Sequence, residues 1–296
     1  MFVGFDLPHT DSHGRLQRIL TAALPSQNNY APSRQLNYWD AEFFNLHQVQ
    51  IFQQSNINEQ SAILELANRS LLEESYFIEK AGVGYMAKMV LLAETVEERM
   101  LYGLFTADEA THLHQISHFL PEIEVTSTDD LFLRLLSEVV ESADKTVLLF
   151  VLQVVLEGWG LSHYRHLAKE CRYPVLAELF SSFLQSESRH HATGTTLFNQ
   201  ITLSAFSQTT ILDVLAQFLF MVQVGPQSVL AAAEQVKGHL TRSQKIQILE
   251  ELNTETHSGT RLQILRSLMG IKSAQSILQT LEERGAFQPL PAYQCV

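Results

Sequence analysis

One arrangement of acidic and histidine residues occurs twice in this 296-residue chain and limits how the chain can fold. Glu79 precedes the motif Glu-Ala-Thr-His at 109–112 by thirty residues, and Glu157 precedes Glu-Ser-Arg-His at 187–190 by the same thirty. A Glu-x-x-His motif alone is a weak signal, but two copies with equal spacing are specific. Residues three apart share a face of an α-helix, so each motif is expected to present its Glu and His on one side of a helix.

Predicted helix breaks divide both copies in the same way. They fall near Ala93–Thr95 and near Cys171–Pro174, about midway between the lone Glu and the motif. An α-helix rises about 1.5 Å per residue, so the two arms of each hairpin have equal length. The four carboxylates are therefore expected at one depth of an antiparallel helical bundle.

Apolar residues at a helical period support four long helices. The expected ranges are Glu59–Leu92, Thr95–Phe119, Lys145–Cys171 and Pro174–Gln200. Glu79 lies on the apolar stripe of the first range and breaks its amphipathic pattern, so it needs a partner. Thr95 and Glu98 form a predicted capping box at the start of the second range. The run Val147–Leu156 is apolar on every side and predicts the most buried element.

The connection between the second and third helices is longer than a hairpin loop. It contains Pro121, a Thr/Ser/Asp run at 126–130 and a predicted short helix at Leu131–Glu141. Such a connection can carry the chain from one end of a bundle back to the other.

The predicted fold is all-α, with extra helices at both ends of the bundle. We expect a helical cover at 1–57, a four-helix bundle at 58–203, helices that pack on the bundle or form a dimer contact at 204–286, and a loose tail at 287–296. The cover includes a helix near His13–Leu24. The C-terminal helices are expected at Thr210–Lys237 with a break at Gly225-Pro226, from a cap at Thr241, at Gly259–Met269 and at Ser273–Arg284.

Composition excludes several classes of partner. A net charge of −12 without a cluster of Lys and Arg argues against nucleic acid. The N-terminus lacks a signal-peptide pattern, and the longest apolar run is too short to span a bilayer. The two cysteines, Cys171 and Cys295, match no zinc or redox spacing. We therefore expect a cytoplasmic protein without a membrane span.

Four carboxylates in one buried layer would repel one another strongly unless cations balance them. Two divalent cations supply that balance. Four carboxylates and two imidazoles leave room for further ligands at both metals. This mixed oxygen and nitrogen set suits iron or manganese better than a structural zinc, which prefers four closed ligands.

At this point residues 59–200 resemble the ferritin-like di-iron carboxylate superfamily, in which one Glu from each of two helices joins a Glu-x-x-His from each of the other two. The resemblance implies two iron ions, with manganese or a mixed Mn/Fe pair as alternatives. The metal ligands that it implies are Glu79, Glu109, His112, Glu157, Glu187 and His190. Glu109 and Glu187 would be the bridges between the metals.

The same resemblance suggests supporting residues around the ligands. Asp108 matches an Asp that holds a ligand His of the opposite helix in several members, and is expected near His190. Ser186 takes that place in the other copy, so the two metal positions need not be equal. Gln153 lies one turn before Glu157 and is its polar neighbour in an apolar run.

Two tyrosines and two glycines near the lone Glu residues allow more than one interpretation. Tyr85 and Tyr164 could hydrogen-bond a ligand, but an ordinary buried Tyr with another partner fits equally well. Gly82 and Gly160 each follow a lone Glu by three residues. They either open space beside the metals or allow close helix packing.

Departures from known subfamilies narrow the implied function. Ile116 stands where the ribonucleotide reductase small subunit has its radical Tyr, the Cys-rich module of rubrerythrins is absent, and ferritins are much shorter. The plan is similar to oxygen-activating members such as acyl-carrier-protein desaturases. We therefore expect a non-haem di-iron oxidase or oxygenase that uses dioxygen to oxidise an apolar small molecule, with electrons from an external donor such as ferredoxin. The alternatives are a ferroxidase or metal-handling protein and a non-catalytic helical interaction protein.

Overall fold

The computed structural model describes residues 7, 10, 14–24, 37–120 and 130–296. Every element in that part of the chain is a helix, and the described residues include no strand. The all-α prediction is therefore confirmed there. By its internal contacts the chain divides into two compact units. Unit 1 comprises Met1–Arg34 and Leu72–Lys145, and unit 2 comprises Gln35–Leu71 and Thr146–Val296.

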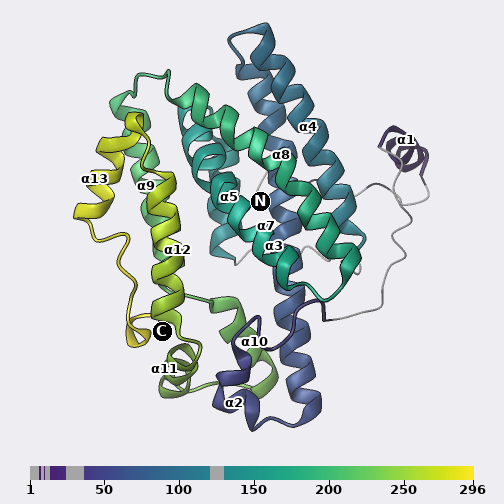
Figure 1. Cartoon of the computed structure of the whole chain (residues 1–296), viewed down its shortest axis with the longest axis vertical. Coiled ribbons are helices and arrows are strands. Elements are labelled where there is room, and N and C mark those ends of the chain that lie inside the picture. The colour runs from purple at the N-terminus through teal and green to yellow at the C-terminus, as the bar shows by residue number, and fades with distance from the viewer. Residues whose placement is uncertain (1–6, 8–9, 11–13, 25–36, 121–129) are drawn as a thin grey trace. The chain divides into compact units, whose positions relative to one another are not determined.

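Unit 1 contains a long helical hairpin. Helix α3 (Ile57–Leu92) enters this unit at Leu72, and α4 (Val96–Ser117) returns beside it (Figure 1). The Thr95 hydroxyl accepts the Glu98 N–H at 3.1 Å, which caps α4 as predicted. The second half of the predicted capping box differs, because the Glu98 carboxylate accepts the N–H of Glu94 instead, at 2.9 Å. Both helices and the break between them agree with the sequence prediction.

Two further helices complete the described part of unit 1. Helix α5 (Leu131–Glu141) has the predicted bounds, and Asp130 caps it by accepting the Leu133 N–H at 2.9 Å. Helix α1 (Arg15–Ala23) lies within the range predicted near His13–Leu24 and has no buried residue. Residues 121–129, where the break in the crossover is predicted, lie outside the described residues.

Unit 2 contains a second helical hairpin. Helix α7 (Glu157–Glu170) and α8 (Pro174–Phe198) are separated by a short break, and Pro174 is the first residue of α8, as predicted. The nine residues before α7 differ from the prediction of a regular α-helix. After one turn, α6 (Lys145–Val147), they form a π-helix, η2 (Leu148–Leu156). Long π-helices are rare, and π-turns occur frequently at functional sites.

The remaining elements of unit 2 are further helices before and after this hairpin. They are η1 (Leu46–Gln48), α2 (Gln50–Gln53), α9 (Ala205–Gln223), α10 (Gln227–Lys237), α11 (Arg242–Glu251), α12 (Thr254–Leu268), η3 (Lys272–Ala274), α13 (Gln275–Glu283) and η4 (Ala292–Gln294). The predicted cap at Thr241 is present as a full capping box with Gln244. Gly225 has a φ of 79°, which ends α9 where the break was predicted.

The C-terminal segment corrects one expectation. The predicted loose tail is packed, because Phe287 and Cys295 are both buried. The Gln223 side chain of α9 donates to the backbone oxygens of Gly285 and Gln288, at 3.2 and 2.7 Å. The buried Phe287 ring and these hydrogen bonds fix the segment that its two prolines suggested was loose.

Two helical stretches, Lys145–Glu170 and Ala205–Gln223, are long and apolar enough to cross a membrane by length and composition alone. Core helices of globular proteins pass the same test, and 56% and 33% of the respective apolar windows are buried in the structure. The expectation that the chain has no membrane span therefore stays a prediction. The predicted domain ranges are a separate prediction, which the structure does not test.

Candidate metal centre

Three predicted ligands come together in unit 1. Glu79 of α3 and Glu109 and His112 of α4 are all buried. The Nδ1 atom of His112 lies 3.0 Å from Oε2 of Glu79. One ligand atom from each of the three side chains lies within 4.8 Å of the others, so this group can hold a metal ion. We call these residues the first triad.

The position of the first triad follows from the sequence of α4. Phe105, Glu109, His112 and Ile116 are buried, as expected for one face of a helix. Large apolar residues therefore precede and follow the polar pair on the same face. The desolvated carboxylates of Glu79 and Glu109 need a balancing charge, which a divalent cation can supply.

The other three predicted ligands come together in unit 2. Glu157 begins α7, and Glu187 and His190 lie on α8. Nδ1 of His190 is 3.7 Å from Oε2 of Glu187 and 4.0 Å from Oε1 of Glu157. One ligand atom from each side chain again lies within 4.8 Å of the others. This second triad has the same composition as the first, two carboxylates and one imidazole.

The π-helix η2 connects to α8 beside the second triad. The Gln153 side chain, fully buried in η2, donates to the backbone oxygen of His190 at 3.2 Å. In return, Nδ1 of His191 donates to the backbone oxygen of Gln153 at 3.1 Å. Gly194 permits this approach, since a Cβ there would stand 2.4 Å from the Gln153 Cβ. Gln153 thus supports the backbone that carries His190.

The donor atoms limit what each triad can bind. Two carboxylate oxygens and one imidazole nitrogen suit borderline and hard divalent ions such as Fe²⁺ and Mn²⁺. Both imidazoles turn Nδ1 toward the carboxylates, at 3.0 Å in the first triad and 3.7 Å in the second. Nε2 of each ring is then the atom that is left for a supporting hydrogen bond. The buried Glu and His clusters can therefore hold metal ions, and these residues fit the group that the sequence implies.

The predicted supporting residues have different outcomes. Tyr85 is buried, and its hydroxyl has no hydrogen-bond partner among the described residues. Tyr164 is buried and its ring packs on Phe180 and Phe183, with centroid distances of 5.4 and 5.6 Å. The expected contact between Asp108 and the His190 ring joins residues of different units and stays a prediction.

Sequence reasoning missed the π-helix and the contact that it makes. His191 of α8 donates to the backbone of η2, and no pattern in the sequence pointed to this contact. The apolar run that forms η2 predicted burial correctly, but a run whose one polar residue is Gln153 shows no helical period. Gly194 was a usable signal, because a glycine inside a helix usually has a packing reason.

Comparison of the chain with protein-family models, with curated proteins and with solved structures finds no significant match. The assignment of a function therefore rests on the residues themselves.

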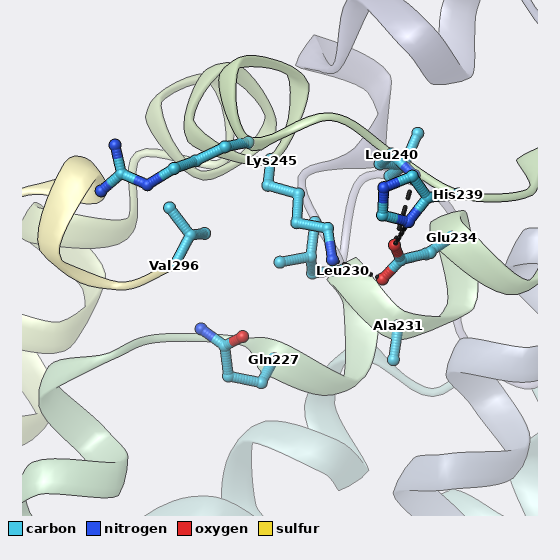
Figure 2. Close-up of a pocket in the computed structure, with 9 residues that line it drawn as sticks. Gln227, Leu230, Ala231, Glu234, His239, Leu240, Lys245 and Val296 are labelled. Carbon is cyan, nitrogen blue, oxygen red and sulfur yellow. Dashed lines mark hydrogen bonds and ion pairs between the residues drawn. The ribbon is translucent and has the colours of Figure 1, made fainter.

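A hollow of about 580 Å³ lies elsewhere in unit 2, between α10, α11 and the C-terminal segment (Figure 2). Three of its charged or titratable side chains contact one another, and Arg242 donates to the backbone oxygen of Tyr293 at 2.7 Å. Glu234 binds Lys245 at 2.7 Å and lies 3.5 Å from His239. None of the predicted site residues lines it.

Proposed function

We propose that the first and second triads act together as one dinuclear metal centre and that the chain is a non-haem di-iron oxidase or oxygenase. The observation that supports this most is the pair of buried triads with identical composition, each within 4.8 Å. Both arise from hairpins with the same spacing of Glu and Glu-x-x-His. Part of the proposal is that the two hairpins form a ferritin-like bundle, since equal arms place all four carboxylates at one depth.

The residues have distinct roles in the proposed centre. His112 and His190 would each hold one metal, and Glu79 and Glu157 would each supply one further ligand. Glu109 and Glu187 would each serve both metals. With both bridges counted, each metal would have four protein ligands, three carboxylates and one imidazole, and the octahedral geometry typical of ions such as Mn²⁺ leaves room for small ligands at each position.

The side chains around the two triads exclude water and fix the positions of the ligand residues. Phe105 and Ile116 flank the first triad on its helix face, and both are buried. In the second triad, the Gln153 side chain fixes the backbone of His190. When bound, two ferrous ions would supply the capacity to activate dioxygen. The apolar surroundings favour an apolar small-molecule substrate, with electrons from an external donor such as ferredoxin in the cytoplasm.

Metal counting on purified protein tests the centre. After anaerobic loading with ferrous iron, the wild type should hold about two ions per chain, as dinuclear sites do. Glu109→Ala and Glu187→Ala should each disturb both positions because a bridge serves both, whereas His112→Ala should mainly weaken one. Glu97→Ala is the matched control, since Glu97 is exposed on the same helix as Glu109. A wild type without bound metal, or bridge variants that bind like the control, would refute the proposal.

Exposure of the loaded protein to dioxygen separates the proposed function from its alternatives. An oxidase or oxygenase should give a transient visible absorption without forming a mineral core. Accumulation of a ferric core would instead indicate a ferroxidase or metal-handling protein. Stable ferrous protein in the presence of dioxygen would indicate a centre without turnover, as expected for a helical interaction protein.

A further inference from the structure

Gly82 lies directly under the carboxylate of Glu109. Both residues belong to unit 1, Gly82 on α3 and Glu109 on α4. A Cβ built on Gly82 would stand 2.1 Å from Oε2, 2.6 Å from Cδ and 3.0 Å from Cγ of Glu109. The first two distances are far below any carbon contact in real proteins. The end of the Glu109 side chain therefore occupies the space that any other residue at position 82 would fill.

This contact places the carboxylate where the first triad needs it. Gly82 is one helical turn after Glu79, so the bare backbone brings the Glu109 oxygen to the same level of α3 as the Glu79 side chain. One oxygen of Glu109 lies within 4.8 Å of ligand atoms of Glu79 and His112. The clash from a methyl group would fall on the flexible end of Glu109. That end would turn away, so the triad would open while the helices remain packed.

Two other glycines near the predicted ligands, Gly84 and Gly160, do not make such a contact. Gly160 follows Glu157 by the same three residues, and a Cβ there meets nothing within 4 Å. Gly84 lies on α3 with Gly82, and a Cβ there would make an ordinary 3.5 Å contact with Val140. Glycine is unfavourable inside a helix compared with alanine, so Gly82 lowers the stability of α3. Its contact with Glu109 gives a reason for a glycine at this position.

We propose that Gly82 is a positioning residue of the metal centre, whose missing side chain sets the place of the Glu109 carboxylate. This rests on the proposed function, because the role has meaning only where Glu109 binds metal. Residues that hold metal ligands in place typically change metal affinity by about 10- to 100-fold when replaced. Gly82→Ala should produce a loss of that size although it touches no metal itself.

The test compares three glycine-to-alanine variants of the full chain. Gly82→Ala should lower ferrous affinity about 10- to 100-fold and reduce the anaerobic metal count. Its apo form should melt at or above the wild-type temperature, because alanine favours the helix. Gly84→Ala and Gly160→Ala carry the same change in helix propensity and should bind metal like the wild type. A merely structural role for Gly82 would instead lower the apo melting temperature.

A double-mutant cycle with Glu109→Asp adds a second readout. Aspartate is one methylene shorter, so its carboxylate withdraws from position 82. In the Asp background the Gly82→Ala change should therefore cause no further loss of affinity. Normal metal uptake by Gly82→Ala beside a loaded wild type, or full additivity in the cycle, would overturn the positioning role alone. A wild type that takes up no metal would overturn the proposed function and this role with it.

Discussion

His163 is a partly buried base whose protonation should control the acid stability of the protein. It lies on α7, and its Nε2 atom is buried with no hydrogen-bond partner among the described residues. Its ring stacks on Trp159, with a centroid distance of 5.6 Å and an interplanar angle of 26°.

Burial lowers the pKa of His163 from 6.5 to about 3, and the positive charges of Arg261 and His166 add to this effect.

The lowered pKa has a definite consequence for folding. Between pH 6.5 and about 3 the unfolded chain binds a proton at His163 and the folded protein does not. The free energy of unfolding must therefore fall as the pH drops through this range, while above pH 6.5 the residue has no such effect. One pKa unit corresponds to about 1.4 kcal/mol, so the loss at pH 4.5 is roughly 2–3 kcal/mol.

The measurement is urea unfolding of the wild type and of His163→Phe at pH 7.5 and pH 4.5. Phenylalanine keeps the stacking on Trp159 and removes the titrating nitrogen, so the variant should lose roughly 2–3 kcal/mol less stability than the wild type between the two pH values. Equal losses of unfolding free energy in the wild type and His163→Phe would refute this prediction, because His163 would then bind its proton as readily in the folded protein as in the unfolded chain.

Two further changes test packing and charge in single units. Gly194→Ala should destabilise the protein by about 1–3 kcal/mol in urea unfolding, because its Cβ would meet the Gln153 Cβ at 2.4 Å and neither atom can turn away. Lys145→Met should cost roughly 1–3 kcal/mol, because the Glu98 carboxylate that it binds at 2.7 Å is buried and would lose its cation. Lys169→Met breaks an exposed pair and should change the free energy of unfolding by less than about 1 kcal/mol. Wild-type stability for the first two variants would contradict these reasons.

The helices and the triads could be predicted from the sequence because both depend on local chemistry. The Thr95 hydroxyl marks a helix start because it accepts a hydrogen bond from an N–H of the first turn that has no partner inside the helix. Pro174 marks another because proline has no N–H to leave unpaired there. Glu109 and His112 share a helix face through their three-residue spacing, and the structure buries both. A carboxylate on an apolar stripe, such as Glu79, stands out because burying it alone is costly.

The close contacts between helices could not be predicted in the same way. The bond from Gln153 to the His190 backbone depends on the π-helical turn of η2, and a run with only one polar residue carries no period that distinguishes a π-helix from an α-helix. The tail was misjudged for a related reason. Its prolines suggested irregular structure, whereas the segment contains η4 and buries Phe287 through tertiary contacts that composition does not encode.

The two triads share a sequence pattern but not a structure, and this difference bears on their chemistry. His112 lies 3.0 Å from its lone Glu, whereas His190 lies 4.0 Å from its own. Gly82 is covered by a ligand carboxylate, whereas a Cβ on the equivalent Gly160 meets nothing within 4 Å. Metal geometry follows from ligand placement and from the residues that support it. Two ions held by these triads would therefore differ in affinity, and we expect metal titration to show two steps rather than one.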